Sequence, residues 1–170
     1  MTTMTIATLV IFPAFMAYAA ASDLVSMRIS NRVALGLTAA FAAFALACGL
    51  SLGMVGWHLA AGALMLVIGF AMFAFGWIGG GDAKLAAATA LWLGPELLFS
   101  YVLLASFAGG LLTLSILSWR DHPLPSFVSG WSWVERLHAP RNGIPYGIAL
   151  ALAALAVFPQ SPIWKAALIG

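Results

Sequence analysis

Long apolar stretches occupy most of this chain, and they constrain its fold more than any motif does. A helix needs about 20 apolar residues to cross the hydrocarbon core of a bilayer. Five stretches are long enough or nearly so, at residues 4–22, 33–50, 57–78, 97–118 and 144–159. Charged residues make up 7% of the 170 residues, against about a quarter in soluble domains. The sequence therefore predicts an all-α, polytopic membrane protein, and we expect one membrane-embedded domain over residues 1–170.

A sixth apolar stretch, at residues 83–94, is shorter and ends at Gly94-Pro95-Glu96. A helix of this length covers only about 18 Å. The following span therefore either begins below the membrane surface or continues through Pro95 with a kink. The first stretch has no basic segment before it and is long enough to span, so we interpret it as a retained helix and not as a signal peptide. The chain is thus expected to have about six transmembrane helices.

The positive charges predict how these helices are oriented. With six spans, alternate loops share one side of the membrane, and that side collects Arg28, Arg32, Lys84, Arg120, Arg136 and Arg141. The opposite side holds only Lys165. By the positive-inside rule the first side is cytoplasmic, which places Asp23 and Asp82 there and both termini outside the cytoplasm. A five-span arrangement would weaken this asymmetry.

Residues 119–143 form the only sizeable polar segment. Phe127, Trp131, Val134 and Leu137 recur at helical spacing, which fits a short interfacial helix at 126–138, but an irregular loop fits equally well. The few scattered cations, for a net charge of +2, indicate no nucleic-acid partner. The lone cysteine and the three dispersed histidines predict neither a disulfide nor a metal site, and no cofactor is expected.

Two aspartates stand where a carboxylate costs free energy unless it is paired, hydrated or used. Asp23 follows the first apolar stretch, and Asp82 follows Gly79-Gly80-Gly81 and opens the sixth. Each alone has an ordinary interpretation: Asp82 as a helix N-cap after a flexible turn, and Asp23 as the end of a helix before a basic loop. An anion at a helix C-terminus opposes the helix dipole, however, so the pair together favours a shared site.

A close pair of carboxylates cannot both ionise easily, so the pair shares a proton. Such a pair can activate a water for attack on a peptide carbonyl and protonate the leaving amine. Asp82, at a helix N-terminus near Lys84, is expected to be the charged member, with Asp23 holding the proton. Ser22 and Ser26 have no histidine partner in sequence, so a serine hydrolase is not expected.

Three motifs in the correct order resemble the type IV leader peptidase family, the prepilin peptidases with a Gly-x-Gly-Asp motif. They are Asp23 with the basic segment that ends in Ile29-Ser30-Asn31-Arg32, then Gly79-Gly80-Gly81-Asp82-Ala83-Lys84-Leu85, and finally Pro145-Tyr146-Gly147. The resemblance implies that Asp23 and Asp82 are the catalytic pair. It also implies supporting roles for Gly79, Gly80, Gly81, Lys84, Asn31, Arg32, Tyr146 and Gly147. Ser30 stands where the family usually has proline, which we expect to loosen this turn.

The resemblance implies an aspartic endopeptidase of the bacterial inner membrane, of the short, peptidase-only form that serves tight-adherence (Flp-type) pili. Its substrate would be a pilin precursor with a short basic leader and an apolar helix, cut at the cytoplasmic face, typically after a glycine. Besides the precursor and the lipid bilayer, the pilus assembly machinery is an expected partner. The alternatives are a small proton-coupled transporter and a structural subunit of a pilus or secretion complex, although a transporter would more often carry acids at mid-helix.

Overall fold

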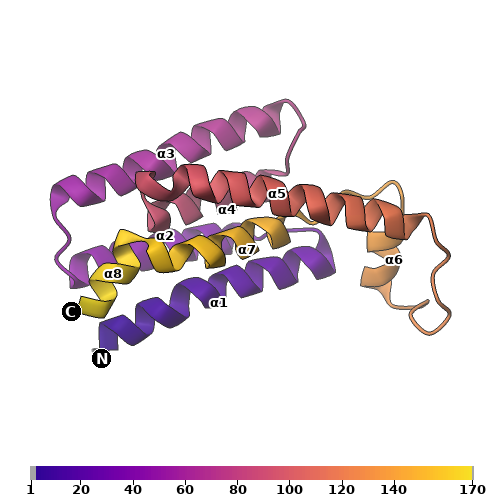
Figure 1. Cartoon of the computed structure of the whole chain (residues 1–170), viewed down its shortest axis with the longest axis horizontal. Helices are drawn as coiled ribbons and strands as arrows, with labels where there is room; N and C mark the ends of the chain where they lie inside the picture. Colours follow the sequence, from indigo (N-terminus) through magenta and orange to yellow (C-terminus); the bar gives the residue numbers. More distant parts are fainter. Residues whose placement is uncertain (1–2, 170) are drawn as a thin grey trace.

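The computed structural model describes residues 3–169, with side chains from residue 9 to residue 167. The elements are α1 (Thr3–Ser26), α2 (Asn31–Ala47), α3 (Leu52–Ala74), α4 (Gly80–Leu93), α5 (Pro95–Arg120), α6 (Ser132–His138), α7 (Tyr146–Val157), the 3-10 turn η1 (Phe158–Gln160) and α8 (Pro162–Ile169). The long helices lie side by side as one bundle, and α6 stands apart from it at one end (Figure 1). The start of α1 and the last helix, α8, lie close together at the opposite end of the bundle (Figure 1).

The helices match the apolar stretches of the sequence, which confirms an all-α, polytopic membrane protein. Among the described residues, three helices are long and apolar enough to cross a membrane: α1 from Leu9, α3 and α5. Two other predicted spans correspond to shorter apolar helices, α2 and α7 with η1, and the sixth corresponds to α4. The 97–118 span does not continue from the sixth, because Gly94 has φ of +74° and separates α4 from α5.

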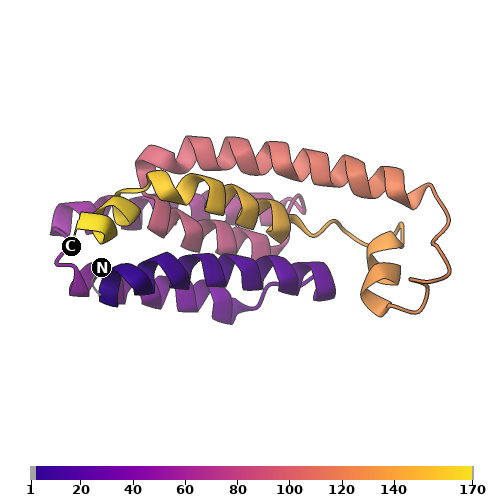
Figure 2. The same ribbon diagram turned by 60° about the horizontal axis from the view of Figure 1, so that its bottom comes forward.

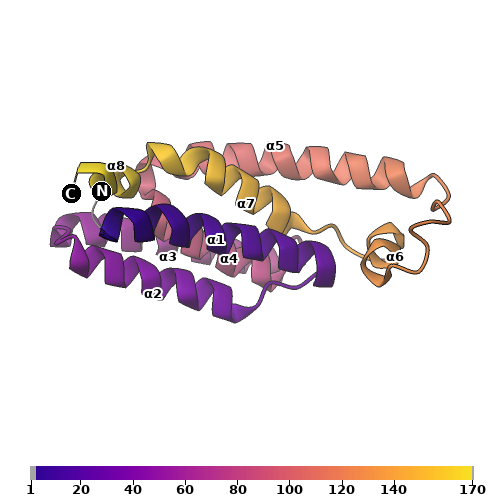
Figure 3. The same cartoon turned by 90° about the horizontal axis from the view of Figure 1, so that it is seen from below.

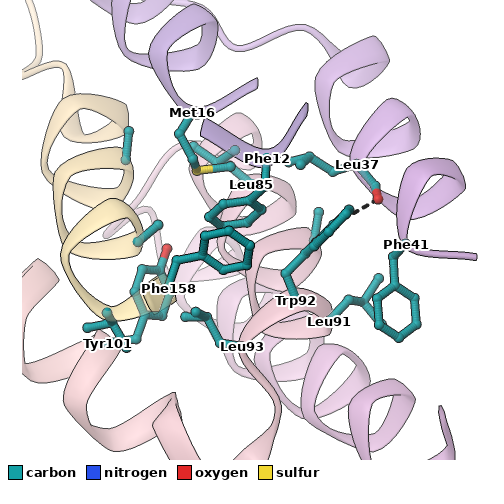
Figure 4. Close-up of a cluster of buried hydrophobic side chains, with 14 of the residues drawn as sticks. Phe12, Met16, Leu37, Phe41, Leu85, Leu91, Trp92, Leu93, Tyr101 and Phe158 are labelled. Carbon is teal, nitrogen blue, oxygen red and sulfur yellow. Dashed lines mark hydrogen bonds between the residues drawn. The ribbon is translucent and has the colours of Figure 1, made fainter. Parts of the chain in front are cut away.

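Helix α4 is the centre of the bundle, which explains why so short a helix is stable in it. Its residues 85–93 are all buried, and it packs against α2, α3, α5 and α7. A helix that is apolar on every face belongs inside a core. Around its last turn Trp92 contacts Phe12 and Phe158, and its indole N–H donates to the Leu37 carbonyl at 3.0 Å (Figure 4).

The outer faces of α3 and α5 expose large apolar side chains, including Val67, Phe70, Leu103, Phe107 and Leu114. So much apolar surface on two helices is what a bilayer would cover. The predicted helix at 126–138 is shorter than expected: α6 covers only Ser132–His138. Residues 126–130 form a turn that ends at Gly130, whose φ of +104° suits glycine and stops a helix from extending backwards. Figure 2 shows this segment beyond the end of α5.

Candidate active site

Asp23 lies near the C-terminal end of α1, with 6% of its surface exposed. Its Oδ2 accepts a hydrogen bond of 2.7 Å from the backbone N–H of Gly147, which is the second residue of α7. The unpaired N–H groups and the dipole of a helix N-terminus favour an anion placed there. The anion that seemed badly placed on its own helix is thus stabilised by the start of another, 124 residues later in the sequence.

Gly147 is at a position where a side chain cannot be accommodated without movement. A Cβ there would lie 2.7 Å from Cδ1 of Ile29, 2.8 Å from Oδ2 of Asp23 and 3.0 Å from its Cβ. The glycine of the late Pro145-Tyr146-Gly147 motif therefore has a physical reason: it lets the backbone of α7 reach the carboxylate.

Asp82 is the third residue of α4 and turns back over the residues before it. Its carboxylate accepts a hydrogen bond from the backbone N–H of Gly79, as the acidic member of a capping box does. Asp82 is in the first turn, ahead of the apolar part of α4. Burial raises the pKa of Asp82 from 3.8 to about 6, the charge of Asp23 adds to the rise, and the bond from Gly79 opposes it. A Cβ on Gly79 would lie 2.9 Å from Oδ2 of Asp82.

Ile29 joins the three motifs. Besides its contact with Gly147, its backbone and Cβ lie against Gly81, where an added Cβ would be 3.1 Å from the Ile29 Cβ and 3.2 Å from its carbonyl oxygen. The glycines at 81 and 147 therefore let two chain segments close on one isoleucine. Ile29 was part of the first motif but was not among the predicted site residues, because its partners are distant in sequence.

Both aspartates line one cavity, which we call the polar cavity. Its walls come from residues 22–31, at the end of α1 and in the following turn, and from residues 79–82. Figure 3 shows the turn from α1 to α2 beside the start of α4 and of α7. The structure therefore brings together the two predicted acids, the three glycines and Asn31.

The turn from α1 to α2 is held by its own hydroxyl groups. Ser22 donates to the Arg28 carbonyl at 2.9 Å, and Ser26 donates to the Ser22 carbonyl at 2.6 Å, one turn back along α1. Met27 has φ of +54° and its N–H bonds the Asp23 carbonyl at 2.8 Å, which ends α1 with a left-handed residue. The serines that looked unsuited to nucleophilic catalysis thus fix the backbone on which Asp23 and Ile29 lie.

Ser30, which we expected to loosen this turn, adopts a backbone conformation that proline would also adopt. Its φ of −66° is the value that proline would impose, and its hydroxyl accepts the Arg32 N–H at 3.2 Å as the N-cap of α2. The side chain therefore keeps the geometry of proline and adds a helix cap.

The other predicted supporting residues are not among those that line the polar cavity. Lys84 donates a hydrogen bond of 2.9 Å to Oδ1 of Asn31, so it joins α4 to α2. The exposed Arg32 contributes its backbone N–H to the cap of α2. Tyr146 points along α5, and its hydroxyl lies 3.0 Å from that of Thr113.

Arg120 and Arg136 hold the 119–143 segment against this end of the bundle. From the sequence these arginines indicated only the orientation in the membrane. Arg136 donates to the Val25 carbonyl at 2.6 Å, at the C-terminal end of α1. Arg120 donates to the carbonyls of Leu137, at 2.9 Å, and Gly143, at 3.0 Å. A cation at a helix C-terminus complements the dipole there. These contacts position the chain that leads into Tyr146 and Gly147.

The site thus holds two carboxylates in different environments. Oδ2 of Asp23 accepts the N–H at the start of α7, which favours its charged form, and burial raises the pKa of Asp82 to about 6, which favours its protonated form. The sequence placed the charge on Asp82, whereas the bond from the Gly147 N–H favours Asp23 as the charged member. A charged acid beside a protonated one can act as a base and an acid in a single reaction. Among the side chains of residues 9–167, no three His, Cys, Asp or Glu come close enough together to hold a metal ion.

The comparisons with known proteins agree with this geometry. The family model described as the type IV leader peptidase family matches residues 10–114, more than half of the chain. The matched region contains both aspartates and ends before Tyr146 and Gly147. No curated protein and no solved structure gave a match.

Proposed function

The chain belongs to the type IV leader peptidase family, and we propose that it is an aspartic endopeptidase that removes the short basic leader of a Flp-type pilin precursor. Membership implies a membrane peptidase with a protein substrate. The observation that carries the finer proposal is the bond from the Gly147 N–H to Asp23, with Asp82 on the wall of the same cavity. The bond joins the third motif, which the family match does not cover, to the first motif, and the shared cavity adds the second.

The proposed mechanism assigns one role to each acid. Asp23, as the anion, accepts a proton from a water that attacks the scissile carbonyl, while protonated Asp82 donates a hydrogen bond and then its proton to the carbonyl oxygen. A carbon–oxygen bond forms to the water oxygen. When the intermediate collapses, the carbon–nitrogen bond breaks and the proton on Asp23 passes to the leaving amine. The carbonyl-oxygen proton returns to Asp82, which restores the starting state.

We place the site on the cytoplasmic side of the bacterial inner membrane. The polar cavity lies at the end of the bundle that carries Arg28, Arg32 and Lys84 and is held to the arginines of the 119–143 segment. By the positive-inside rule this end faces the cytoplasm and the opposite end, where α1 begins, faces outward. Pilus assembly machinery remains a proposed partner.

Replacement of each acid by asparagine tests the proposal. Asn keeps the shape of Asp but cannot share the proton, so Asp23→Asn and Asp82→Asn should each slow processing by at least about 10²-fold, the lower end of general acid–base contributions. Asp121→Asn is the matched control, because Asp121 is the third aspartate of the chain and is exposed at the end of α5.

The assay is cleavage of a co-expressed pilin precursor, followed by gel shift and by mass spectrometry of the new N-terminus. Membrane insertion and elution from a sizing column in detergent check that each variant is folded. Processing at the wild-type rate by either single variant would remove that residue from the dyad. A wild-type chain that leaves the precursor uncut would contradict the proposed substrate.

A further inference from the structure

Asp82 lines a second cavity besides the polar one, and the two differ sharply in character. The second is an apolar groove between α3 and α5, floored by α4 and α7, which we call the α3–α5 groove. Its cavity volume is about 210 Å³, and its lining includes Gly69, Asp82, Ala86, Ala105, Ser106 and Tyr146. Asp82 is the only charged residue among those that line it. Figure 1 shows where α3 and α5 lie in the bundle.

The lining residues make this groove suitable for a helix. Small side chains allow two helix backbones to approach closely, and close packing is the main source of helix association in lipid. Ala86 on α4, Ala105 and Ser106 on α5 supply small side chains, and Ser106 is exposed. The floor of the groove leads to Tyr146, whose neighbour Gly147 bonds Asp23. Asp82 therefore lines the groove itself, and Asp23 is connected to it through Gly147, the neighbour of Tyr146.

The order of polarity along the two cavities is the second observation. A chain that runs from the polar cavity past Asp82 into the α3–α5 groove passes from serine, asparagine and arginine side chains to an apolar surface. A leader-bearing precursor has the same order: a polar, basic segment, then the bond to be cut, then an apolar helix. The acidic pair between the two cavities faces the position of that bond.

We propose that the α3–α5 groove binds the apolar helix of the substrate, while the leader occupies the polar cavity. The inference rests on the proposed function and adds to it the place and direction of the bound substrate. The groove then determines specificity in two ways. The substrate must have an apolar helix immediately after the cut, and that helix must carry small side chains where it packs against α5.

A second apolar groove, between α2 and α3, competes for this role. It contains Ala63 and leads to Lys84 and Asn31, which are hydrogen-bonded to each other at 2.9 Å. Neither aspartate lines it. A helix bound there would end at a cation and an amide that already bond one another, and the cut would lie away from the acids. The structure therefore favours the α3–α5 groove.

Filling each groove with a larger side chain separates the two. Ala105→Leu should lower kcat/KM for a precursor with an intact apolar helix by at least about tenfold. The larger side chain occupies space that the substrate helix needs, so the loss should appear mainly as a higher KM. Two matched controls should stay close to the wild-type value: Ala63→Leu in the α2–α3 groove and Gly110→Leu on α5, where an added Cβ meets nothing within 4 Å. A loss in Ala63→Leu without a loss in Ala105→Leu would overturn the proposal.

Thiol protection gives a readout that does not depend on catalysis or on a bulky substitution. In a Cys48→Ser, Asp82→Asn background, Ser106→Cys introduces one thiol in the α3–α5 groove, and Ala63→Cys introduces one in the other. The precursor should slow alkylation of the first thiol at least about tenfold and leave the second unchanged. Equal alkylation rates of the first thiol with and without precursor would refute binding of the substrate helix in the α3–α5 groove. If the wild type fails to cut the precursor, the proposed function fails, and the protection assay still decides whether a helix binds in the groove.

Discussion

Gly147→Ala tests the contact between α7 and Asp23 with the smallest possible change. The added Cβ would lie 2.8 Å from Oδ2 of Asp23, and ordinary contact begins near 3.4 Å, so the carboxylate has to retreat by about 0.6 Å. The same movement stretches the 2.7 Å bond from the Gly147 N–H to about 3.3 Å, beyond the usual range for an N–H···O bond. A hydrogen bond to a charged group is worth about 1.5–3 kcal/mol.

If this bond orients Asp23 for catalysis, losing it should lower kcat/KM about ten- to hundredfold. The measurement is initial cleavage of purified precursor in detergent, with thermal unfolding of the same preparation. Gly110→Ala is the control, because a Cβ there meets no atom within 4 Å. Its rate should equal that of the wild type.

Ile29 is the other obstacle to a side chain at 147, and a double variant distinguishes the two. Ile29→Val removes Cδ1, which is the atom 2.7 Å from the added Cβ, but leaves the contact with Asp23. We therefore expect Gly147→Ala with Ile29→Val to remain slow. Recovery of the rate in the double variant would mean that Ile29 and not Asp23 is displaced. A wild-type rate in Gly147→Ala alone would refute the reasoning, since the carboxylate would then tolerate the shift.

Four further outcomes are expected. The pKa of Asp82, raised to about 6 by burial and then by the charge of Asp23, means that kcat/KM should fall as pH rises through that value and the shared proton is lost. It should fall again at low pH, when Asp23 gains a proton, so a flat profile from about pH 4 to pH 9 would contradict the dyad. Ser30→Ala should cost about 1 kcal/mol of stability in thermal unfolding through loss of the α2 cap. Chelators should leave cleavage unchanged, and restoration of a lost rate by zinc would show a metal requirement. In a Cys48→Ser background, the thiol of Ser129→Cys should resist an impermeant reagent applied to intact spheroplasts, and labelling there would refute the proposed orientation.

The sequence was sufficient for the features that depend on local pattern. Apolar stretches predicted the helices, and the break at Gly94 and Pro95 was visible in the residues themselves. The limits of the interfacial helix were not predicted, because helical spacing from Phe127 to Leu137 continues across Gly130 and hides the turn there. Helix α8 was also missed, although Ser161 before Pro162 is an N-cap signal, and its hydroxyl accepts the Trp164 N–H at 3.0 Å.

The site was predicted in its members but not in its contacts. Motif order singled out Asp23, Asp82 and Gly147, yet nothing in the spacing joins the last to the first, because that bond closes a loop of most of the chain. The same is true of Arg136 and the Val25 carbonyl. Local rules placed the charge on Asp82, because they considered only the helix that carries each aspartate and not the start of α7, whose N–H reaches Asp23.

The lengths of α4 and α5 explain how a carboxylate pair inside an apolar bundle can be used. The two helices start from the same break at Gly94 and run in opposite chain directions along the bundle (Figure 1). At 1.5 Å per residue, α5, with 26 residues, extends about 18 Å farther than α4, with 14. Asp82 therefore lies well short of the end of α5, within the length of the bundle. The polar cavity connects it to the turn after α1, so water and a polar leader have a route to the acids past serine, asparagine and arginine residues. A longer α4 would carry Asp82 out to the level of Arg120 and separate it from the α3–α5 groove.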